Sequence, residues 1–383
     1  MKSKLFFSVG LLLLAGACRA QTEIRIAVVN PTQILRVQES IELDWAEIQK
    51  RSADLKPEET AVLEASTRQP LRTQVLQIDG RTSLLFQTDL QPGQKKEFIL
   101  LKRPEGMTEP DSPARTYCRF IPERKDDFGW ENDRAAYRMY GPALEDETIT
   151  SGIDAWGKCV PYPVIDKFIR DYNEKKISYH EDHGEGGDFY KVGPTLGCGG
   201  LAPFVDGKVC LPPRNFVQWK ILANGPLRSV FELTYKAWQA GPYTVSEVKR
   251  ISIDLGSNLS RIECTYTCPQ TDTLPLAAGI VLRETSQQTW KAPQSIAYWL
   301  PTDFISGHMG CGVLFGAGWA AEPTEADGHL LLTLSHKLSK PVVYYAGSCW
   351  DKNEEFRTFE KWQQYLKTFK QRLDNPVAVE WLP

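Results

Sequence analysis

The chain has 383 residues, of which 42% are hydrophobic and 24% charged, and its formal net charge is −3. This composition is ordinary for a globular protein of about two domains, and the slight negative charge argues against a nucleic-acid-binding protein, which needs a basic surface. Walker A, GxGxxG, GxSxG and EF-hand patterns are absent from the sequence. Nucleotide, dinucleotide and serine-hydrolase chemistry are therefore disfavoured.

The N-terminus resembles an export signal. Lys2 and Lys4 precede an apolar run at residues 5–15, which is too short to span a bilayer. Residues 1–20 are therefore predicted to be a signal peptide, and the protein is expected in the periplasm or as an outer-membrane lipoprotein. Two cleavage sites remain open, a lipobox that ends at Cys18 and an ordinary site before Gln21. Only a lipid on Cys18 would attach the protein to a membrane.

Residues 22–102 are predicted to form a small β-sandwich-like domain. Strands are expected at residues 24–29, 73–78, 83–88 and 98–102. Asp79-Gly80 is a hairpin signal between the second and third of these strands. Residues 103–115 hold three prolines and are predicted to be a linker.

Residues 116–383 are predicted to form a larger and mainly β domain. Long alternating strands are expected near residues 229–238, 251–255 and 262–266, and further short strands follow. Many strands in one domain of this size imply a large antiparallel sandwich. Helices are expected at 164–175 and 359–373, the second being amphipathic and stopped by Asn375-Pro376.

The cysteines predict no zinc ribbon, and the expected export permits disulfides without determining their pattern. No CxxC pattern occurs, which excludes a zinc ribbon and a thioredoxin-type site. Cys198 and Cys210 can close a short loop by a disulfide. Cys264 and Cys268 lie four residues apart on an expected strand, about 13 Å at the rise of a strand, and should not pair.

Several motifs resemble known families. PLRSVFELTYKAW and VSEVKRISIDLGSNLSRIECTY resemble the long strands of galactose-mutarotase-like supersandwich proteins, a class that includes aldose epimerases and domains of polysaccharide lyases. GWENDRAAYRMYGPALE, HEDHGEGGDFYKVG and YYAGSCWDK resemble domain of unknown function 4861, an uncharacterised family of exported bacterial proteins. The resemblance covers residues 22–383. It implies a supersandwich and a gene neighbourhood of glycan-degrading enzymes, and it brings no settled reaction.

Residues 179–200 carry seven glycines among titratable side chains and are predicted to be a functional loop. His180, His183 and Glu185 can begin a metal site for calcium or zinc, although their spacing fits no standard zinc signature. A catalytic or substrate-contacting role for the two histidines, and no role at all, remain the alternatives.

The same segment suggests chemistry on an acidic sugar. A uronate lyase neutralises the carboxylate, removes a proton and protonates the leaving oxygen, for which arginine, histidine and tyrosine are suited. The predicted catalytic residues are His180, His183, Tyr190 and Arg138. The predicted substrate-binding residues are Trp130, Arg134, Tyr179, Glu185, Asp188 and His308. Structural salt bridges for the arginines and core packing for the tryptophan are the competing interpretations.

Two other function classes stay open: a different carbohydrate enzyme, which is a hydrolase or an epimerase, and a non-catalytic glycan-binding lipoprotein. A glycoside hydrolase needs a carboxylate pair, for which Glu131, Asp133, Glu185 and Asp188 are candidates. An epimerase needs a histidine acid and a glutamate base, and His308 can supply the histidine. A non-catalytic glycan-binding lipoprotein would instead use tryptophan platforms such as Trp130 and Trp156. The preferred prediction is an exported polysaccharide or oligosaccharide lyase whose partner is an acidic glycan.

Overall fold

The computed structural model describes residues 23–144, 152–283, 288–300 and 306–383. The predicted signal peptide and both cleavage sites lie outside these residues. Among the helices of the described part, none is long and apolar enough to cross a membrane.

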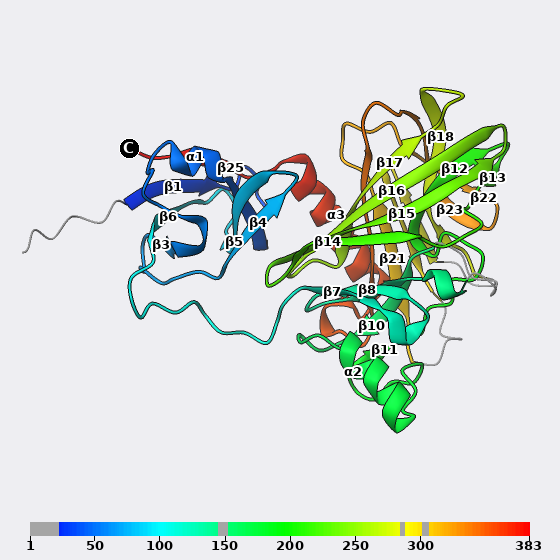
Figure 1. The fold of residues 1–383 in the computed structure, drawn as a ribbon, viewed down its shortest axis with the longest axis horizontal. Coiled ribbons are helices and arrows are strands. Elements are labelled where there is room, and N and C mark those ends of the chain that lie inside the picture. The colour runs from blue at the N-terminus through cyan, green and yellow to red at the C-terminus, as the bar shows by residue number, and fades with distance from the viewer. Residues whose placement is uncertain (1–22, 145–151, 284–287, 301–305) are drawn as a thin grey trace, which may run out of the picture.

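A small β-sandwich forms the N-terminal part of the molecule (Figure 1). One sheet has the order β25 (Ala378–Trp381), β1 (Glu23–Val29), β6 (Lys95–Lys102), β3 (Thr60–Glu64), and the other has β2 (Arg36–Asp44), β5 (Arg81–Leu90), β4 (Thr73–Ile78). The short helix α1 (Trp45–Gln49) follows β2. Alternate residues such as Val28, Phe86 and Phe98 point inward and form a separate core. The predicted hairpin is confirmed: Asp79 and Gly80 both have positive φ, as a two-residue turn requires.

The C-terminal strand returns to this first domain. β25 pairs with β1 through four residue pairs from Ile26↔Trp381 to Val29↔Ala378. The predicted division assigns all of residues 116–383 to the large domain and does not anticipate this strand. Arg51 lies over the Trp381 ring at 4.0 Å, which adds a cation–π contact to the pairing.

Deleting residues 376–383 is expected to lower the free energy of unfolding by roughly 2–4 kcal/mol, because Val379 and Trp381 would no longer cover the core and β1 would become an edge strand. Urea unfolding measures this change. The matched variant Trp381→Ala should lose a smaller part of the stability, and an unchanged midpoint for the deletion would contradict the role of β25.

The large domain is an antiparallel supersandwich, as predicted. Its eight-stranded sheet has the order β14 (Gln218–Asn224), β15 (Arg228–Ala240), β16 (Tyr243–Asp254), β17 (Leu259–Thr267), β24 (Val342–Trp350), β21 (Met309–Leu314), β20 (Ser295–Trp299), β19 (Gln288–Ala292). The facing sheet has the order β13 (Lys208–Val209), β12 (Cys198–Val205), β18 (Thr273–Val281), β23 (His329–Lys337), β22 (Glu322–Ala326). Inward residues of the two sheets, such as Ile262, Tyr344 and Leu276, form one core.

A third sheet of this domain carries the WEND motif and the glycine-rich loop. Its order is β11 (Gly186–Gly187), β10 (Asp154–Lys158), β9 (Ala136–Met139), β8 (Asp127–Glu131), β7 (Tyr117–Ile121). Phe128 stacks on Phe231 of the large sheet at 4.2 Å, which joins this small sheet to the main core. Helix α2 (Ile165–Arg170) continues as a π turn to Lys175, close to the predicted bounds. In Figure 1, α2 and β11 lie together at the lower end of the molecule.

The amphipathic helix α3 (Phe359–Asp374) packs on the outer face of the large sheet. Its buried residues are Phe359, Trp362 and Leu366, and they contact Trp299 and Leu314 of the sheet. Thr358 caps the first turn by accepting a hydrogen bond from Lys361 N. The predicted amphipathic helix is therefore confirmed, and its apolar face packs on the sheet.

All eight cysteines of the described residues are free. The predicted Cys198–Cys210 disulfide is therefore not formed. Cys198 is buried, and its thiol contacts the carbonyl oxygen of Gly347, whereas Cys210 lies on the partly exposed segment after β13.

Candidate functional site

The histidine loop, residues 179–188, is a closed turn at the end of the small sheet. The amide of Asp188 donates to the carbonyl oxygen of Tyr179 at 2.8 Å, so the two ends of the loop are bonded together. Gly186 has a φ of +126°, and a Cβ there would lie 2.0 Å from the Gly157 carbonyl oxygen. Glycine is therefore needed where the loop pairs with β10, which explains part of the glycine density.

A buried cluster of one arginine and three aspartates lies directly beneath the histidine loop. Arg138 is the third residue of β9 and pairs in register with Asp154 of β10. Its NH2 lies 2.7 Å from Asp154 Oδ2 and 2.8 Å from Asp188 Oδ2, and its NH1 lies 3.6 Å from Asp127 Oδ2. The rings of Tyr140 and Trp156 face the guanidinium. We call these four charged residues the aspartate–arginine cluster.

This cluster holds more negative than positive groups in a buried place. Burial raises the pKa of Asp127 to about 6, against the attraction of Arg138. Burial and the neighbouring charge of Asp188 raise the pKa of Asp154 well above its ordinary value. Asp127 Oδ2, Asp154 Oδ1 and two nitrogens of Arg138 have no hydrogen-bond partner. Perturbed carboxyl groups of this kind gather at functional sites more often than elsewhere.

The raised pKa of Asp127 predicts a pH-dependent stability. Between its ordinary value of 3.8 and about 6, the folded state binds the proton more tightly than the unfolded state. The stabilisation from this group is therefore complete at low pH and is lost as the pH rises through about 6, a change of roughly 3 kcal/mol. Asp127→Asn should remove this dependence, so the stability of wild type relative to the variant should fall across about pH 4 to 7 in urea unfolding. Parallel pH profiles would contradict the buried, titrating carboxyl.

His180 is the solvent-facing member of the site. Its side chain is 52% exposed, and its Nδ1 lies 3.1 Å from the carbonyl oxygen of Asp188 and 3.6 Å from the carboxylate of the same residue. The imidazole packs on Tyr179 with ring centroids 4.5 Å apart. The Tyr179 hydroxyl accepts a 2.7 Å hydrogen bond from Arg124 Nε. His180 and Arg124 thus flank one tyrosine ring, and we call these three residues the His180 face.

Five predicted site residues are buried and cannot contact a substrate directly as predicted; they are Arg138, Trp130, Tyr190, Tyr179 at 3% exposed and Asp188 at 5% exposed. Arg138 is 3% exposed and is already surrounded by three carboxyl groups, so it has no place for a substrate carboxylate. Trp130 is 1% exposed and donates to Ser260, which makes it a core residue and excludes sugar stacking. Tyr190 lies in the main core, where burial and nearby Cys311 raise its pKa well above the ordinary value.

The remaining predicted residues are dispersed. Asp188 contributes to the buried cluster, and Trp156, a further platform candidate, is 2% exposed and packs on Tyr179. Glu185 turns away to Lys167 and to the Tyr162 hydroxyl, and His183 Nε2 lies 2.9 Å from the Ser178 carbonyl oxygen. Arg134 pairs with Glu355 at 2.5 Å.

His308 belongs to a neighbouring loop. Its Nδ1 lies 2.9 Å from the Leu300 carbonyl oxygen, and its ring stacks on Trp299. Its carbonyl oxygen accepts the amide of Asp351, while the next residue, Lys352, pairs with Asp182 of the histidine loop at 2.6 Å. The histidine loop and the loop of His308 therefore both contact the turn at Asp351 and Lys352. Among the described residues, no contact directs His308 toward His180.

The predicted metal ligands do not converge. In the part of the chain that the structure describes, no three or more histidine, cysteine, aspartate or glutamate side chains form a group that could hold a metal ion. His180, His183 and Glu185 each have a different protein partner. These three residues therefore supply no common ligand set for calcium or zinc, and metal binding stays a prediction.

Sequence reasoning missed Arg124, Asp127 and Asp154. Arg124 and Asp127 belong to the charged run PERKDD, whose pattern indicates only a solvated turn. Two successive residues of that turn, Lys125 and Asp126, have positive φ, and this tight reversal brings Arg124 toward the histidine loop. Asp154 meets Arg138 only through the pairing of β10 with β9, which no local pattern reveals.

Comparison with known proteins decides the family. The profile of "Domain of unknown function (DUF4861)" matches residues 28–379. The chain belongs to the DUF4861 family. A curated relative of this DUF4861 chain, "Uncharacterized protein P7" of Formosa agariphila, is 33% identical over 98% of each chain. Neither description names a reaction.

Two solved structures are similar to this DUF4861 chain at 9% identity. One is a protein in the glycosyl hydrolase family 38 from Enterococcus faecalis, with a TM-score of 0.47 over 94% of this chain and 47% of that chain. The other is an alpha-mannosidase from Enterococcus faecalis V583, with a TM-score of 0.43 over 94% and 46%. The chain spans about half the length of these two proteins, and scores this low do not establish a shared activity.

Proposed function

We propose that the protein is an exported carbohydrate-active enzyme that cleaves uronate-containing glycans by β-elimination, with His180 as the base. The observation that carries the proposal is the geometry of His180: a half-exposed imidazole whose Nδ1 is bonded to the carbonyl oxygen of Asp188, with the carboxylate of the same residue 3.6 Å away. A base must be both oriented by the protein and open to the substrate.

The contact at Nδ1 selects the useful tautomer. A carbonyl oxygen only accepts, so Nδ1 carries the proton when the ring is neutral, and the Nε2 lone pair is then free to accept another proton. The Asp188 carboxylate at 3.6 Å stabilises the imidazolium that forms. In the proposed step, Nε2 takes the C5 proton, the C4–C5 double bond forms and the C4–O bond breaks. The leaving oxygen then takes a proton, which the imidazolium can return.

Arg124 takes the place that sequence reasoning gave to Arg138. Its side chain is 22% exposed, its Nε donates a hydrogen bond to Tyr179, and its NH1 lies 4.0 Å from the buried Asp127 Oδ2. The fork of an arginine pairs with a carboxylate, which neutralises a uronate and acidifies its C5 proton. Tyr179 positions Arg124 and supports the His180 ring. The exposed rings of Tyr162 and Tyr172, near the same loop, replace Trp130 and Trp156 as stacking platforms.

The hydrolase alternative is less well supported. Glu131 is buried against Lys158 at 2.7 Å and accepts the amides of Val164 and Ile165, so it closes the start of α2. Asp133 accepts the Gly256 amide, far along the chain from the loop. The described candidates therefore form no open carboxylate pair of the kind that hydrolysis requires.

The test is a screen of the purified chain, from residue 22 onward, against polygalacturonate, alginate, ulvan and neutral controls. Ultraviolet absorbance detects the unsaturated product, and a reducing-end assay detects any cleavage. We expect both signals on one acidic glycan. Reducing ends without absorbance would replace the lyase by a hydrolase, and binding without either signal would establish a non-catalytic glycan-binding protein. Loss of activity with a chelator would show that the predicted divalent metal is needed.

A further inference from the structure

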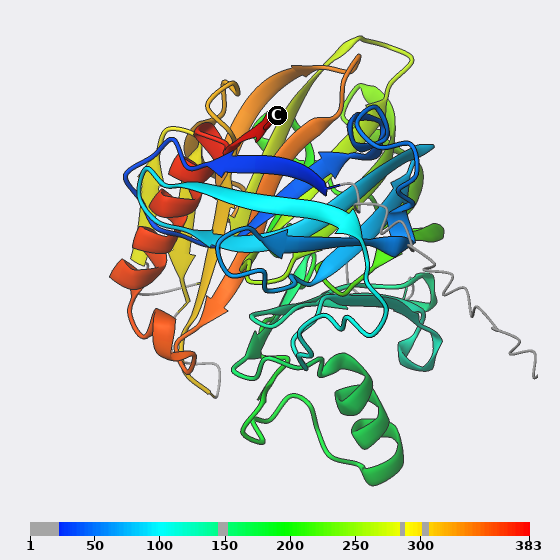
Figure 2. The same ribbon diagram turned by 90° about the vertical axis from the view of Figure 1, so that its left-hand side faces the viewer.

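A groove of about 500 Å³ lies between the two domains, on the outer face of the eight-stranded sheet. Its floor comes from β15, β16, β17 and β24, one wall from β2 and β4, and the other from α3. Figure 2 shows the N-terminal sheets, in blue and cyan, lying over the strands of the large sheet with α3, in red, beside them. This volume is within the range of small-molecule sites.

The floor of the groove is a regular polar ladder. Paired residues of antiparallel strands share a face, so one row runs across the sheet as Val230, Ser252, Arg261 and Tyr345. The adjacent row on one side pairs Arg228 with Asp254, and the row on the other side pairs Arg250 with Glu263. Donors and acceptors therefore alternate along and across the floor.

The charged groups that line the groove balance. They are Arg228, Arg250, Arg261 and Arg372 against Glu39, Glu42, Asp254 and Glu263. Arg228 pairs with Asp254 and Glu42, Arg261 with Glu263 at 2.9 Å, and Arg372 with Glu39 at 2.6 Å. A ligand carboxylate would have to displace one of these partners. Hydroxyl groups both donate and accept, so they can be added to such pairs without displacing them.

An aromatic wall completes the groove. Tyr365 and Phe369 of α3 line one side, and Tyr345 at the edge of the floor meets Phe369 edge to face at 5.2 Å. Aromatic rings supply flat apolar surface that suits the C–H face of a sugar, with a polar handle on tyrosine. The polar ladder of the floor can bond the hydroxyl groups of a sugar, and the aromatic wall can pack against its C–H face.

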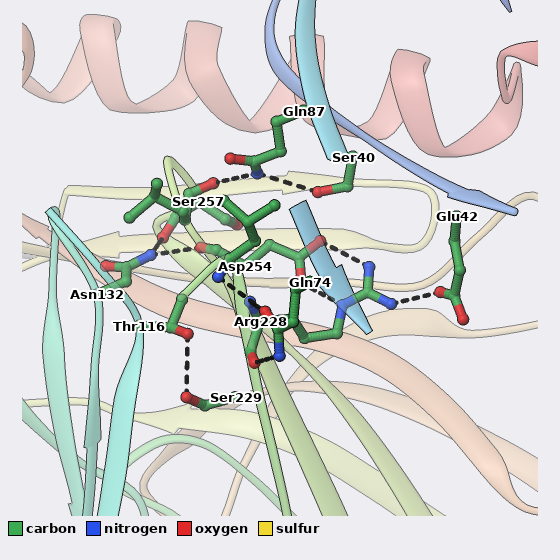
Figure 3. Close-up of polar contacts among 12 residues, drawn as sticks. Ser40, Glu42, Gln74, Gln87, Thr116, Asn132, Arg228, Ser229, Asp254 and Ser257 are labelled. Carbon is green, nitrogen blue, oxygen red and sulfur yellow. Dashed lines mark hydrogen bonds and ion pairs between the residues drawn. The ribbon is translucent and has the colours of Figure 1, made fainter. Parts of the chain in front are cut away.

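The groove is held open by a fixed domain interface. Gln74 Oε1 accepts the amides of Leu227 and Arg228, and its Nε2 donates to the Arg228 carbonyl oxygen (Figure 3). Gln87 donates to the Leu255 carbonyl oxygen, and Leu76 and Leu85 pack against Leu227 and Leu255. The walls are therefore bonded to the floor before any ligand arrives, which lowers the ordering cost of binding.

We propose that this interdomain groove binds a neutral oligosaccharide segment. The site lies on the outer face of the large sheet, whereas the His180 face belongs to the small sheet beside α2. The inference goes beyond the proposed reaction and does not depend on it. A heteropolysaccharide with both neutral and uronate sugars would be able to use both sites.

The test is native affinity electrophoresis of the full chain in gels that contain galactomannan, xyloglucan, laminarin, polygalacturonate or alginate. We expect at least one neutral glycan to retard the wild type. Ser252→Trp should weaken that retardation by about tenfold or more, because the indole fills the floor of the groove. Arg261→Ala, which leaves the groove open, should also weaken it. The control is Val248→Trp, on the same face of β16 but outside the groove and 36% exposed.

The outcomes separate the groove from the His180 face. Retardation that survives both groove variants, retardation only by acidic glycans, or none by any neutral glycan would overturn the inference. Melting temperatures equal to that of Val248→Trp would show that the groove variants are folded. Ultraviolet absorbance on acidic glycans is measured on the same samples, so failure of the lyase and failure of the groove give different patterns.

Discussion

His180→Ala is expected to lower the rate of β-elimination by about 10²- to 10⁴-fold on the glycan that the screen identifies, while the protein remains folded. The variant removes the exposed imidazole whose Nδ1 is fixed to Asp188. The ring is half exposed, so its loss leaves no large cavity and should change stability little. Initial rates of ultraviolet absorbance measure the effect, which should fall on kcat more than on KM.

The matched control for this variant is His336→Ala. His336 also bonds a backbone carbonyl oxygen, that of Lys340, but it lies on β23 and packs on Trp319. Its rate should equal that of wild type. Added imidazole should partly restore His180→Ala, because a small base can enter the vacated position. A rate for His180→Ala within a factor of about two of wild type would remove His180 from the proposed mechanism.

Arg138→Ala is expected to lower the free energy of unfolding by roughly 3–5 kcal/mol, the largest stability effect of the substitutions considered. The variant leaves three buried aspartates without their shared cation. Urea unfolding measures the loss. Asp154→Asn should cost less, because burial and the neighbouring charge of Asp188 raise the pKa of Asp154 and so already disfavour its ionised form.

Arg357→Ala is the control for Arg138→Ala. It removes an exposed pair with Glu354, so its effect should stay below about 1 kcal/mol. If Arg138→Ala fails to fold, Arg138→Lys keeps the charge without the fork and should unfold at an intermediate urea concentration. An unfolding midpoint of Arg138→Ala equal to that of Arg357→Ala would contradict a buried cluster.

The regular elements could be predicted because local patterns determine them. Alternation along β15 to β17 places Phe231, Ile251 and Ile262 in the core, as their period of two requires. The apolar periodicity of the last helix, ended by Asn375-Pro376, predicts residues 359–373, and the observed helix α3 is Phe359–Asp374. The family resemblance also supplied the supersandwich, which periodicity alone indicates only as a large sandwich.

The candidate site was only half predictable because it is built by long-range pairing. The glycine-rich segment marked the loop, and the structure does bring Tyr179, His180, Asp188 and Arg138 together. Sequence alone does not show which of them is buried. Burial therefore forbids the predicted roles of Arg138 and Tyr190, and no local pattern indicates Arg124, which lies 55 residues before the tyrosine it contacts.

The most direct test of the central claim is mass spectrometry of the products that wild type and His180→Ala release from a defined uronate oligosaccharide. The account predicts that wild type releases a fragment lacking one water, with an unsaturated uronate at its new non-reducing end, and that His180→Ala releases almost none. Hydrated fragments alone, or equal yields of the unsaturated fragment from both proteins, would contradict β-elimination by His180.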